Sequence, residues 1–253
     1  MQHRAALPRD PAISVRALSF AYRRDLPLVL DRFELDVEPG ARCLLIGANG
    51  AGKTTLLRIL AGKHMVPAEA VRVLGRPAFH DTALAGMVEY LGTSFPFDVD
   101  LRVGDLVAGV RPVEPTRRDR LSALLGIDPD WHMHRVSDGQ RRRVQILLGL
   151  IRPRQVLFLD EVTTDLDLCA RQELLDFLRE ESEMRSVTIL YATHILDRLE
   201  AWATHLCALR AGRVAWIGPV EDMPELVQAR AAGRASPLYE AVLAWLRAAP
   251  ALL

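Results

Sequence analysis

The sequence predicts an α/β fold in which a mostly parallel sheet carries helices on both faces. Along most of the chain, short apolar runs alternate with segments of helical periodicity, which is the pattern of parallel strands joined by helices. One of these runs, residues 43–46, leads into a glycine-rich turn that opens a helix. Ahead of it, residues 13–37 alternate apolar and polar side chains, which indicates a small antiparallel sheet.

The composition is that of an ordinary soluble globular protein. Of 253 residues, 50% are hydrophobic and 25% are charged. No apolar run approaches the roughly 20 residues needed to span a bilayer, and the N-terminal residues lack the apolar core of a signal peptide. The formal net charge is zero, so no overall field attracts nucleic acid. We therefore expect a cytoplasmic protein whose partner is not a nucleic acid.

The first elements in chain order are two strands and a tight turn. The apolar positions of the first strand change parity between Val15 and Leu18, which predicts a bulge near residues 16 and 17. A second alternating strand is expected over residues 29–37. The pair Pro39-Gly40 then predicts a turn into the apolar run that precedes the glycine-rich loop.

The glycine-rich turn is Gly47-Ala48-Asn49-Gly50-Ala51-Gly52-Lys53-Thr54, which matches the pattern G-x-x-x-x-G-K-[ST] without a mismatch. A strand, turn and helix in this order aim several backbone N–H groups and the positive end of the helix dipole at one point, which suits a polyphosphate. Lys53 would reach the β- and γ-phosphates, and the hydroxyl of Thr54 would bind Mg²⁺.

Beyond this loop, the pattern predicts a core interrupted by a helical lobe. Further strands are expected at residues 70–74, 88–91, 156–159, 187–192, 206–209 and 214–217, and helices at 54–60, 103–107, 116–125, 140–150, 168–181 and 195–203. We expect one domain over residues 1–253, with a core formed by 11–92 and 154–220, a helical lobe by 93–153 and a helical tail by 221–253. The apolar stripe of the tail is interpreted as core packing, with a partner-binding face as the alternative; it comprises Leu238, Val242, Trp245 and Leu246.

Two of the apolar strands end in residues that can act on a phosphate. Residues 156–159 lead into Asp160 and Glu161, and ligand-binding groups of open α/β sheets lie at this carboxyl end of the strands. Asp160 can hold Mg²⁺, and Glu161 is placed to take a proton from the water that attacks a γ-phosphate. His194 follows another such strand and could donate a hydrogen bond to the γ-phosphate, although a lone histidine is more often structural.

A polar segment opens the helix expected at residues 140–150. Ser137 is a plausible N-cap for this helix. The three arginines at residues 141–143 could be read as a nucleic-acid patch. Because the chain as a whole is neutral, we interpret them instead as a solvated helix face beside the nucleotide interface.

Taken in order, these motifs resemble those of an ATP-binding cassette (ABC) ATPase. That family carries a signature motif, Leu-Ser-Gly-Gly-Gln, just upstream of its Walker B strand, and the corresponding segment here is Val136-Ser137-Asp138-Gly139-Gln140. The resemblance covers about residues 13–218. It implies a P-loop NTPase fold of ABC type and hydrolysis of ATP to ADP and phosphate. It also implies a homodimer, or a pair with another ABC ATPase, in which each nucleotide lies between the P-loop of one copy and the signature motif of the other.

The resemblance also implies roles for individual residues. The residues implied to hold ATP are Tyr22, by stacking on adenine, and Gly47, Asn49, Gly50, Gly52, Lys53, Thr54 and Thr55, by cradling the phosphates. Thr54 and Asp160 would bind Mg²⁺, Glu161 would be the catalytic base and His194 the switch histidine. The residues implied to act on the nucleotide of the other copy are Ser137, Gly139, Gln140 and the D-loop residue Asp167.

Two departures from the family pattern bear on function. Thr93 stands at about the position where transporter cassettes carry a glutamine that contacts Mg²⁺, the attacking water and the membrane partner, and Asp138 replaces the first signature glycine. With these departures, residues 136–144 and 160–167 resemble a soluble cytosolic ABC subfamily known from fungi and plants and associated in yeast with gene-regulatory machinery.

Three functions remain open. We expect an ATPase whose hydrolysis drives conformational change in a partner protein. The alternative is the ATP-binding subunit of an ABC transporter with a separately encoded permease. A nucleic-acid-directed ABC protein is disfavoured, because the chain has one cassette, no coiled-coil insertion and no net basic charge.

Overall fold

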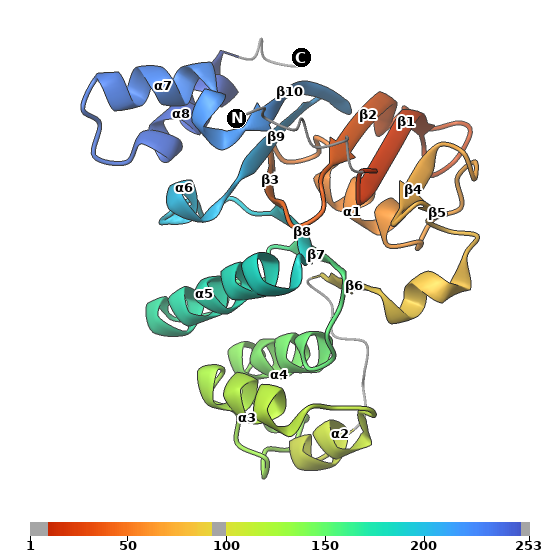
Figure 1. The fold of residues 1–253 in the computed structure, drawn as a ribbon, viewed down its shortest axis with the longest axis vertical. Helices are drawn as coiled ribbons and strands as arrows, with labels where there is room; N and C mark the ends of the chain where they lie inside the picture. Colours follow the sequence, from red (N-terminus) through yellow and green to blue (C-terminus); the bar gives the residue numbers. More distant parts are fainter. Residues whose placement is uncertain (1–9, 93–99, 249–253) are drawn as a thin grey trace, which may run out of the picture.

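The main sheet of the protein has six strands in the order β10-β9-β3-β8-β7-β6 (Figure 1). The structure is a computed structural model that describes residues 10–92 and 100–248. Neighbouring strands are parallel except for the antiparallel pair of β9 and β10. The strand bounds are β3 (Arg42–Gly47), β6 (Val88–Leu91), β7 (Val156–Asp160), β8 (Thr188–Ala192), β9 (His205–Arg210) and β10 (Arg213–Pro219). The predicted mostly parallel sheet is confirmed.

The central strands β3, β7 and β8 are buried on both faces. Alternate residues of β3 enter two different cores, because side chains along a strand point to opposite faces. On one face, Leu44 and Ile46 pack with α5 (Leu168–Arg185) and α6 (Leu199–Trp202); on the other, Cys43 and Leu45 pack with α1 (Lys53–Leu60). The continuous apolar runs of the sequence therefore mark strands that are covered on both sides.

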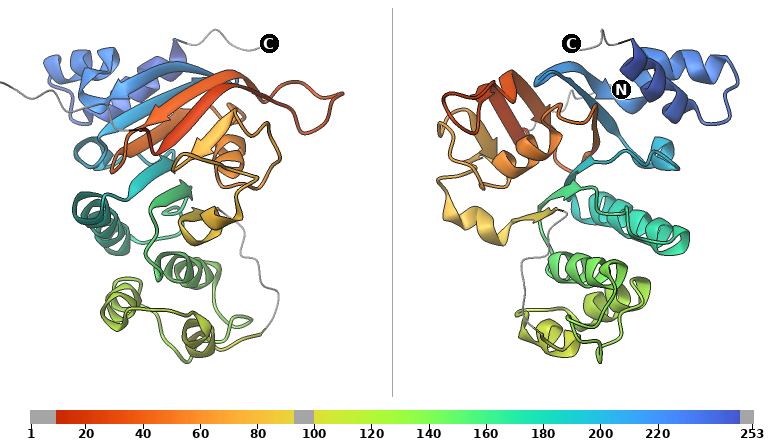
Figure 2. Two further views of the ribbon diagram at one scale, coloured as in Figure 1. Left: turned by 45° about the vertical axis from the view of Figure 1, so that its right-hand side comes forward. Right: turned by 180° about the vertical axis from the view of Figure 1, so that it is seen from behind.

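The second sheet is antiparallel and covers the far side of α1, as Figure 2 shows. Its strand order is β2-β1-β4-β5, with bounds β1 (Ile13–Phe20), β2 (Leu30–Val37), β4 (Val71–Val73) and β5 (Arg76–Pro77). The pairing of β1 with β2 shifts register between Val15 and Leu18, and Ala17 has φ of 44°. The predicted bulge is thus confirmed at the residues where the apolar parity changes.

The helical lobe lies at the end of the molecule opposite the antiparallel sheet (Figures 1 and 2). Its helices are α2 (Val103–Gly109), α3 (Pro115–Leu124) and α4 (Asp138–Leu150). Arg117 of α3 joins the lobe to α5 through Glu181, at 2.7 Å between Nη1 and Oε1, and it also donates to the carbonyl of Leu150. Leu121 and Ile146 add apolar contacts to the core that lies under α5.

The C-terminal helices α7 (Pro224–Ala231) and α8 (Pro237–Arg247) pack on the same core as α5. Leu238, Val242 and Trp245 are buried there, and Leu246 is partly buried against them. The guanidinium of Arg210 lies 4.6 Å from the Trp245 ring centroid and donates to the Trp245 carbonyl. The interpretation of the apolar stripe as core packing is confirmed for these residues.

The largest error in the predicted helices concerns residues 195–203. Only Leu199–Trp202 is helical, and Arg198 ahead of it has φ of 61°. Arg171 of α5 donates to the carbonyls of Ile195 and Asp197, which satisfies them without a helix. Periodicity cannot reveal such a tertiary hydrogen bond.

Three short elements escaped prediction: β5 and the 3-10 turns η1 (Thr82–Gly86) and η2 (Val220–Asp222). Among the described residues, no helix is long and apolar enough to cross a membrane.

Candidate nucleotide site

The loop between β3 and α1 has the backbone that the glycine pattern predicts. Gly47 has φ of 155°, and a Cβ there would lie 2.6 Å from the carbonyl oxygen of Leu209. Gly52 has φ of 104°, and its Cβ would lie 2.9 Å from the Leu30 side chain. A side chain at Gly47 would have to displace the backbone of β9, and a side chain at Gly52 would meet Leu30 and strain the positive-φ backbone. The glycines therefore serve the packing of the loop on the sheet as well as its approach to a ligand.

Lys53 lies inside the loop that it is predicted to serve. Its Nζ donates to the carbonyl oxygens of Gly47 and Ala48, at 2.7 and 3.1 Å. Burial lowers the pKa of Lys53, while the charges of Glu161 and Asp160 oppose that shift. An ammonium held by the loop in this way points into the space that the backbone N–H groups surround.

Thr54 and Asp160 meet at the carboxyl edge of the sheet. The Thr54 hydroxyl donates to Oδ1 of Asp160 at 3.2 Å, although 106 positions separate the two residues. The other carboxylate oxygen, Oδ2, accepts from the hydroxyl of Tyr90 at 3.1 Å. The two residues predicted to bind Mg²⁺ are thus brought together, and a third residue that the sequence reasoning missed orients one of them.

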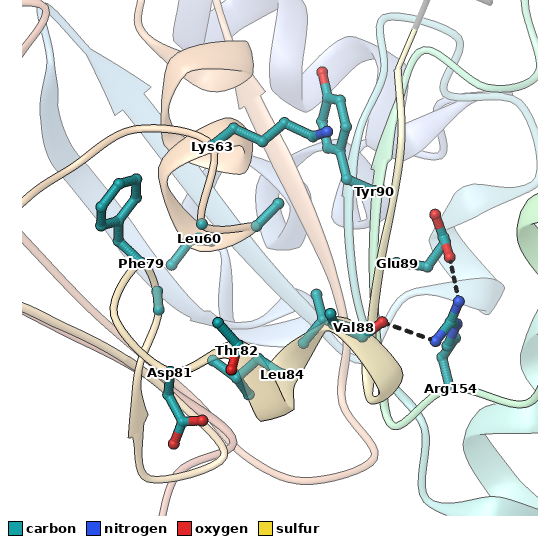
Figure 3. Close-up of a pocket in the computed structure, with 14 residues that line it drawn as sticks. Leu60, Lys63, Phe79, Asp81, Thr82, Leu84, Val88, Glu89, Tyr90 and Arg154 are labelled. Carbon is teal, nitrogen blue, oxygen red and sulfur yellow. Dashed lines mark hydrogen bonds and ion pairs between the residues drawn. The ribbon is translucent and has the colours of Figure 1, made fainter. Parts of the chain in front are cut away.

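Tyr90 stands between this edge and a pocket on the outside of the sheet (Figure 3). The pocket has a volume of about 500 Å³. On the pocket side, Nζ of Lys63 lies 5.3 Å from the centroid of the Tyr90 ring. Nearby, Arg154 pairs with Glu89 at 2.9 Å. The only signal for Tyr90 in the sequence was its position near the end of an apolar strand.

Glu161 and His194 form a pair. Nδ1 of His194 lies 3.0 Å from Oε2 of Glu161, and the backbone N–H of His194 donates to the same oxygen at 3.4 Å. Glu161 has φ of 52°, an uncommon conformation for a residue with a side chain. This backbone conformation directs the Glu161 carboxylate across the end of β7 toward His194 at the end of β8. The predicted base and the predicted switch histidine are therefore in contact.

Arg142 contradicts the interpretation of the arginine run as a solvated face. It is only 5% exposed. Its guanidinium donates to the carbonyl oxygens of Gly92, Asp160 and Glu161. Burial lowers its pKa, with nearby carboxylates acting in the opposite sense. In a neutral chain, three successive arginines carried no signal that one of them would be internal.

The other two arginines of the run remain partly exposed. Arg143 pairs with Asp167 at 2.8 Å, and Asp167 also caps α5 by accepting from the backbone N–H of Ala170. These contacts, the hydrogen bond from Ala170 first, lower the pKa of Asp167. The D-loop is thereby attached to the signature helix of the same chain.

The signature residues cap their own helix. The Ser137 hydroxyl oxygen accepts from the backbone N–H of Gln140, and the Gln140 side chain accepts from the backbone N–H of Ser137. This reciprocal capping box sets the start of α4 at Asp138, two residues earlier than predicted. The Asp138 side chain is fully exposed, 3.9 Å from Arg141. Within the described residues, no hydrogen bond or ion pair joins this motif to the P-loop of its own chain.

Two further predictions concern the rim of the site. Tyr22 is 48% exposed, and its hydroxyl shares a 2.9 Å hydrogen bond with Thr55 at the start of α1. The ring also packs edge-to-face with Phe20 and His64, and about half of its surface stays exposed for stacking on a base. Thr93, the predicted departure from the glutamine of transporter cassettes, lies outside the described residues.

The C-terminal helix also reaches the site, which the sequence did not indicate. A small cavity of about 110 Å³ lies between the P-loop, the end of β8 and α8. Asn49 and His194 line it from the core, and Tyr239 and Leu243 line it from α8. The tail therefore forms part of the wall beside the P-loop.

The residues at this edge fit a magnesium nucleotide. The N-cap residue of α1, Gly52, offers no side-chain hydrogen bond to the first turn, so its N–H groups are available to phosphate oxygens. A Cβ at Gly50 would meet nothing within 4 Å, so the loop is open on that side. Thr54 and Asp160 supply the oxygen ligands that Mg²⁺ prefers. No cluster of three or more His, Cys, Asp or Glu side chains suited to a metal occurs in the described part of the chain.

Comparison with known proteins identifies relatives of the whole chain. The family model described as ABC transporter matches residues 30–164. ABC transporter I family member 21 of Arabidopsis thaliana is 47% identical over 261 residues, which cover 98% of this chain and 90% of the relative. CCR4-associated factor 16 of Saccharomyces cerevisiae is 38% identical over 223 residues, which cover 80% of this chain and 77% of the relative.

A solved structure of an ATP-binding cassette, a dimer bound to ADP and phosphate, shares the fold. Its TM-score is 0.70 at 16% identity, over 82% of this chain and 98% of that one. The predicted fold class is confirmed, as is the predicted kinship with ABC proteins of fungi and plants. The chain belongs to the ATP-binding cassette family, binds ATP and is an ATPase.

Proposed function

We propose that two copies of this chain enclose two Mg·ATP head to tail and that hydrolysis drives a conformational change in a partner protein. The observation that carries this proposal is an asymmetry within one chain. The P-loop, Asp160, Glu161 and His194 converge on one edge of the sheet, whereas Ser137 contacts only its own helix. We call the first group of residues the floor of the nucleotide site and the signature helix around Ser137 the roof. A floor and a roof that lie apart in one chain suit a site shared by two copies related by a two-fold axis.

The floor of the site binds and orients the triphosphate. Lys53 exchanges its two carbonyl contacts for the β- and γ-phosphate oxygens, which makes charge-assisted hydrogen bonds. Thr54 and Asp160, which lie within hydrogen-bond distance of each other, would hold Mg²⁺. When bound, the metal neutralises the charge that develops on the phosphate oxygens during transfer.

Glu161 takes the proton from the attacking water, and His194 holds the carboxylate in place. A neutral imidazole donates from only one of its nitrogens. If Nδ1 of His194 donates to Glu161, then a hydrogen bond from Nε2 to the γ-phosphate requires a protonated ring. A γ-phosphate that accepts a hydrogen bond from His194 therefore either replaces Glu161 as the acceptor or binds a histidine that carries a second proton. In both cases the bound nucleotide alters the contact between His194 and the base.

The roof comes from the signature helix of the second copy. The Ser137 oxygen accepts from Gln140, so its own O–H remains available to donate to a γ-phosphate oxygen. The N–H groups at the start of α4 add to this anion site, together with Gly139. The neighbour with the same fold was solved as a dimer with ADP and phosphate, which supports this arrangement.

We propose a cytoplasmic protein partner, because ATP and Mg²⁺ are abundant there and a yeast relative is named as a CCR4-associated factor. The alternative is a transporter subunit with a separate permease, since the plant relative is named as an ABC transporter. Affinity purification of a trapped ATP-bound form from native cells separates the two. Recovery of chiefly an integral membrane permease would support the alternative, and recovery of soluble partners would support the proposal.

The test of the enzymatic proposal is Glu161→Gln. This variant should retain Mg·ATP binding and lose on the order of 10² to 10⁴ in turnover, because the general base is gone. Size-exclusion chromatography with Mg·ATP should show a stable dimer, whereas wild type should return to the monomer as ATP is consumed. Turnover at the wild-type rate would show that Glu161 is not the base, and a strictly monomeric active wild type would refute the shared site.

A further inference from the structure

We propose that Arg142 is a positioning residue for the catalytic base. It holds the main chain of Glu161 and links the signature helix α4 to the end of β7 in its own chain. This inference rests on the proposed function, because it takes Glu161 to be the base. Within one copy, Arg142 connects the helix that covers the nucleotide of the other copy to the residues that hold the copy's own nucleotide.

The contacts of Arg142 converge on the main chain of the Walker B pair. Nη2 donates to the carbonyl oxygens of Asp160 at 3.4 Å and of Glu161 at 3.2 Å. Nη1 donates to the side chain of Gln145 at 2.5 Å and to the carbonyl of Gly92. One planar guanidinium thus joins three segments: the signature helix, the end of β7 and the chain that follows β6.

Arg142 is a buried cation that forms no ion pair with the described residues. The side chain is buried, no carboxylate of the described residues forms an ion pair with it, and its Nε has no hydrogen-bond partner there. Burying a cation whose hydrogen-bond acceptors are all neutral carbonyl and amide oxygens is unfavourable compared with a neutral side chain of the same size. A residue kept under that penalty is a candidate for function rather than for stability.

Glu161 has a backbone that needs such support. Its φ of 52° is disfavoured for a residue with a Cβ, and strained residues persist where surrounding contacts over-determine them. Its N–H donates to the carbonyl of Ala192, and its carbonyl accepts from Arg142 and from the Thr164 hydroxyl at 3.1 Å. Without Arg142 the carbonyl is held from one side only, so the peptide can rotate and carry the carboxylate away from its position beside His194.

Arg142 also lies one and a half turns beyond Ser137 on the same helix. A shift of α4 that seats its N-terminus on a nucleotide therefore moves the guanidinium against Glu161 of the same chain. The base of one site responds in this way to occupancy of the site that the same copy roofs.

The experiment compares Arg142→Gln and Arg142→Lys with the control Arg141→Gln. Arg141 is the neighbouring arginine, partly exposed, and its contacts are the carbonyl of Met133 at 3.1 Å and the exposed carboxylate of Asp138 at 3.9 Å. Arg142→Gln should lower kcat on the order of 10²-fold, as expected when a catalytic group is displaced by about 1 Å. Its KM and its affinity for Mg·ATP should stay within about twofold, because the P-loop is untouched. Arg142→Lys should be intermediate, and Arg141→Gln should match wild type.

A double-mutant cycle with Glu161→Gln separates positioning from a structural role. If Arg142 acts through Glu161, then Arg142→Gln should cause no further loss of turnover in the Glu161→Gln background. A multiplicative loss in that background, or wild-type kcat in Arg142→Gln, would overturn the inference. If Arg142→Gln does not fold, as judged by its melting curve, the same cycle with Arg142→Lys decides. Unimpaired turnover by Glu161→Gln alone would instead refute the base assignment and leave Arg142 without a role.

Discussion

The sheet edge and the signature lobe differ in how their functional groups are held. At the sheet edge, the predicted metal ligands Thr54 and Asp160 contact each other, and so do the predicted catalytic residues Glu161 and His194. In the lobe, the hydrogen bonds of Ser137 stay within its own helix. The first region is preorganised by one chain, whereas the second presents a capped helix end that has no partner in its own P-loop. The chain therefore builds two unlike half-sites and joins them through a few buried side chains.

The largest expected effect is a loss of stability when the buried ion pair between Arg117 of the lobe and Glu181 of α5 is broken. Arg117→Ala should lower the free energy of unfolding by about 3 kcal/mol, because it leaves the buried Glu181 with only the half-exposed Arg185, 3.5 Å away, as its ion-pair partner. The Arg117 and Glu181 side chains are 5% and 9% exposed. The matched control is Arg120→Ala, which breaks an exposed pair with Glu180 at the same distance and should cost at most about 1 kcal/mol. Urea titration measures the free energy of unfolding of both variants. Equal losses of this free energy would contradict a stabilising role for the buried pair.

The second-largest expected effect is a loss of ATP affinity when the lysine of the P-loop is removed. Lys53→Ala should weaken Mg·ATP binding by about 10- to 100-fold, which corresponds to the loss of hydrogen bonds to a charged group. Calorimetric titration with a non-hydrolysable ATP analogue measures the affinity. Arg141→Gln, which alters the lobe and leaves the P-loop of its own chain untouched, serves as the control. An unchanged affinity in Lys53→Ala would mean that the loop binds phosphate through its backbone alone.

A mixing experiment tests the division into floor and roof directly. Lys53→Ala lacks a working floor and Ser137→Ala lacks a working roof, so each homodimer should be impaired. In an equal mixture, random pairing makes about half of the dimers mixed, and each mixed dimer has one site built from two intact halves. ATPase activity should therefore recover to about a quarter of the wild-type value if the two sites work independently, and to less if the base of one site depends on occupancy of the other, as inferred for Arg142. No recovery, with mixed dimers demonstrated by differential tags, would contradict a site shared between copies.

The smallest effect concerns the orientation of the metal ligand. Tyr90→Phe removes the hydrogen bond to Asp160 and should raise the Mg²⁺ concentration needed for half-maximal activity by about 3- to 10-fold. Binding of Mn²⁺ to the complex with a non-hydrolysable ATP analogue, followed by electron paramagnetic resonance, should weaken equally. Lys63→Ala changes the other side of the same ring and should leave both values unchanged (Figure 3). Equal effects of the two variants would show that the ring, not the hydroxyl, matters.

Much of the fold followed from pattern alone. The alternation of parallel strands and helices, the bulge between Val15 and Leu18 and the buried stripe of α8 were all predicted from apolar spacing. These features are local or depend on one periodicity, so a single sequence carries them. The segment before α6 was misjudged because Arg171, far away in the chain, supplies hydrogen bonds that replace those of a helix.

The sequence by itself determined the family, the ATPase activity and the chemical character of the site, because a phosphate loop, a carboxylate pair and a serine-capped helix each need particular residues at close spacing. Only the tertiary structure decided which long-range side chains orient them. Tyr90 reaches Asp160 because β6 and β7 are neighbours in the sheet, and Arg142 reaches Glu161 because α4 packs across the end of β7. Such contacts join residues that no local pattern connects, and one buried arginine among three looks like any other until the packing of its helix is known.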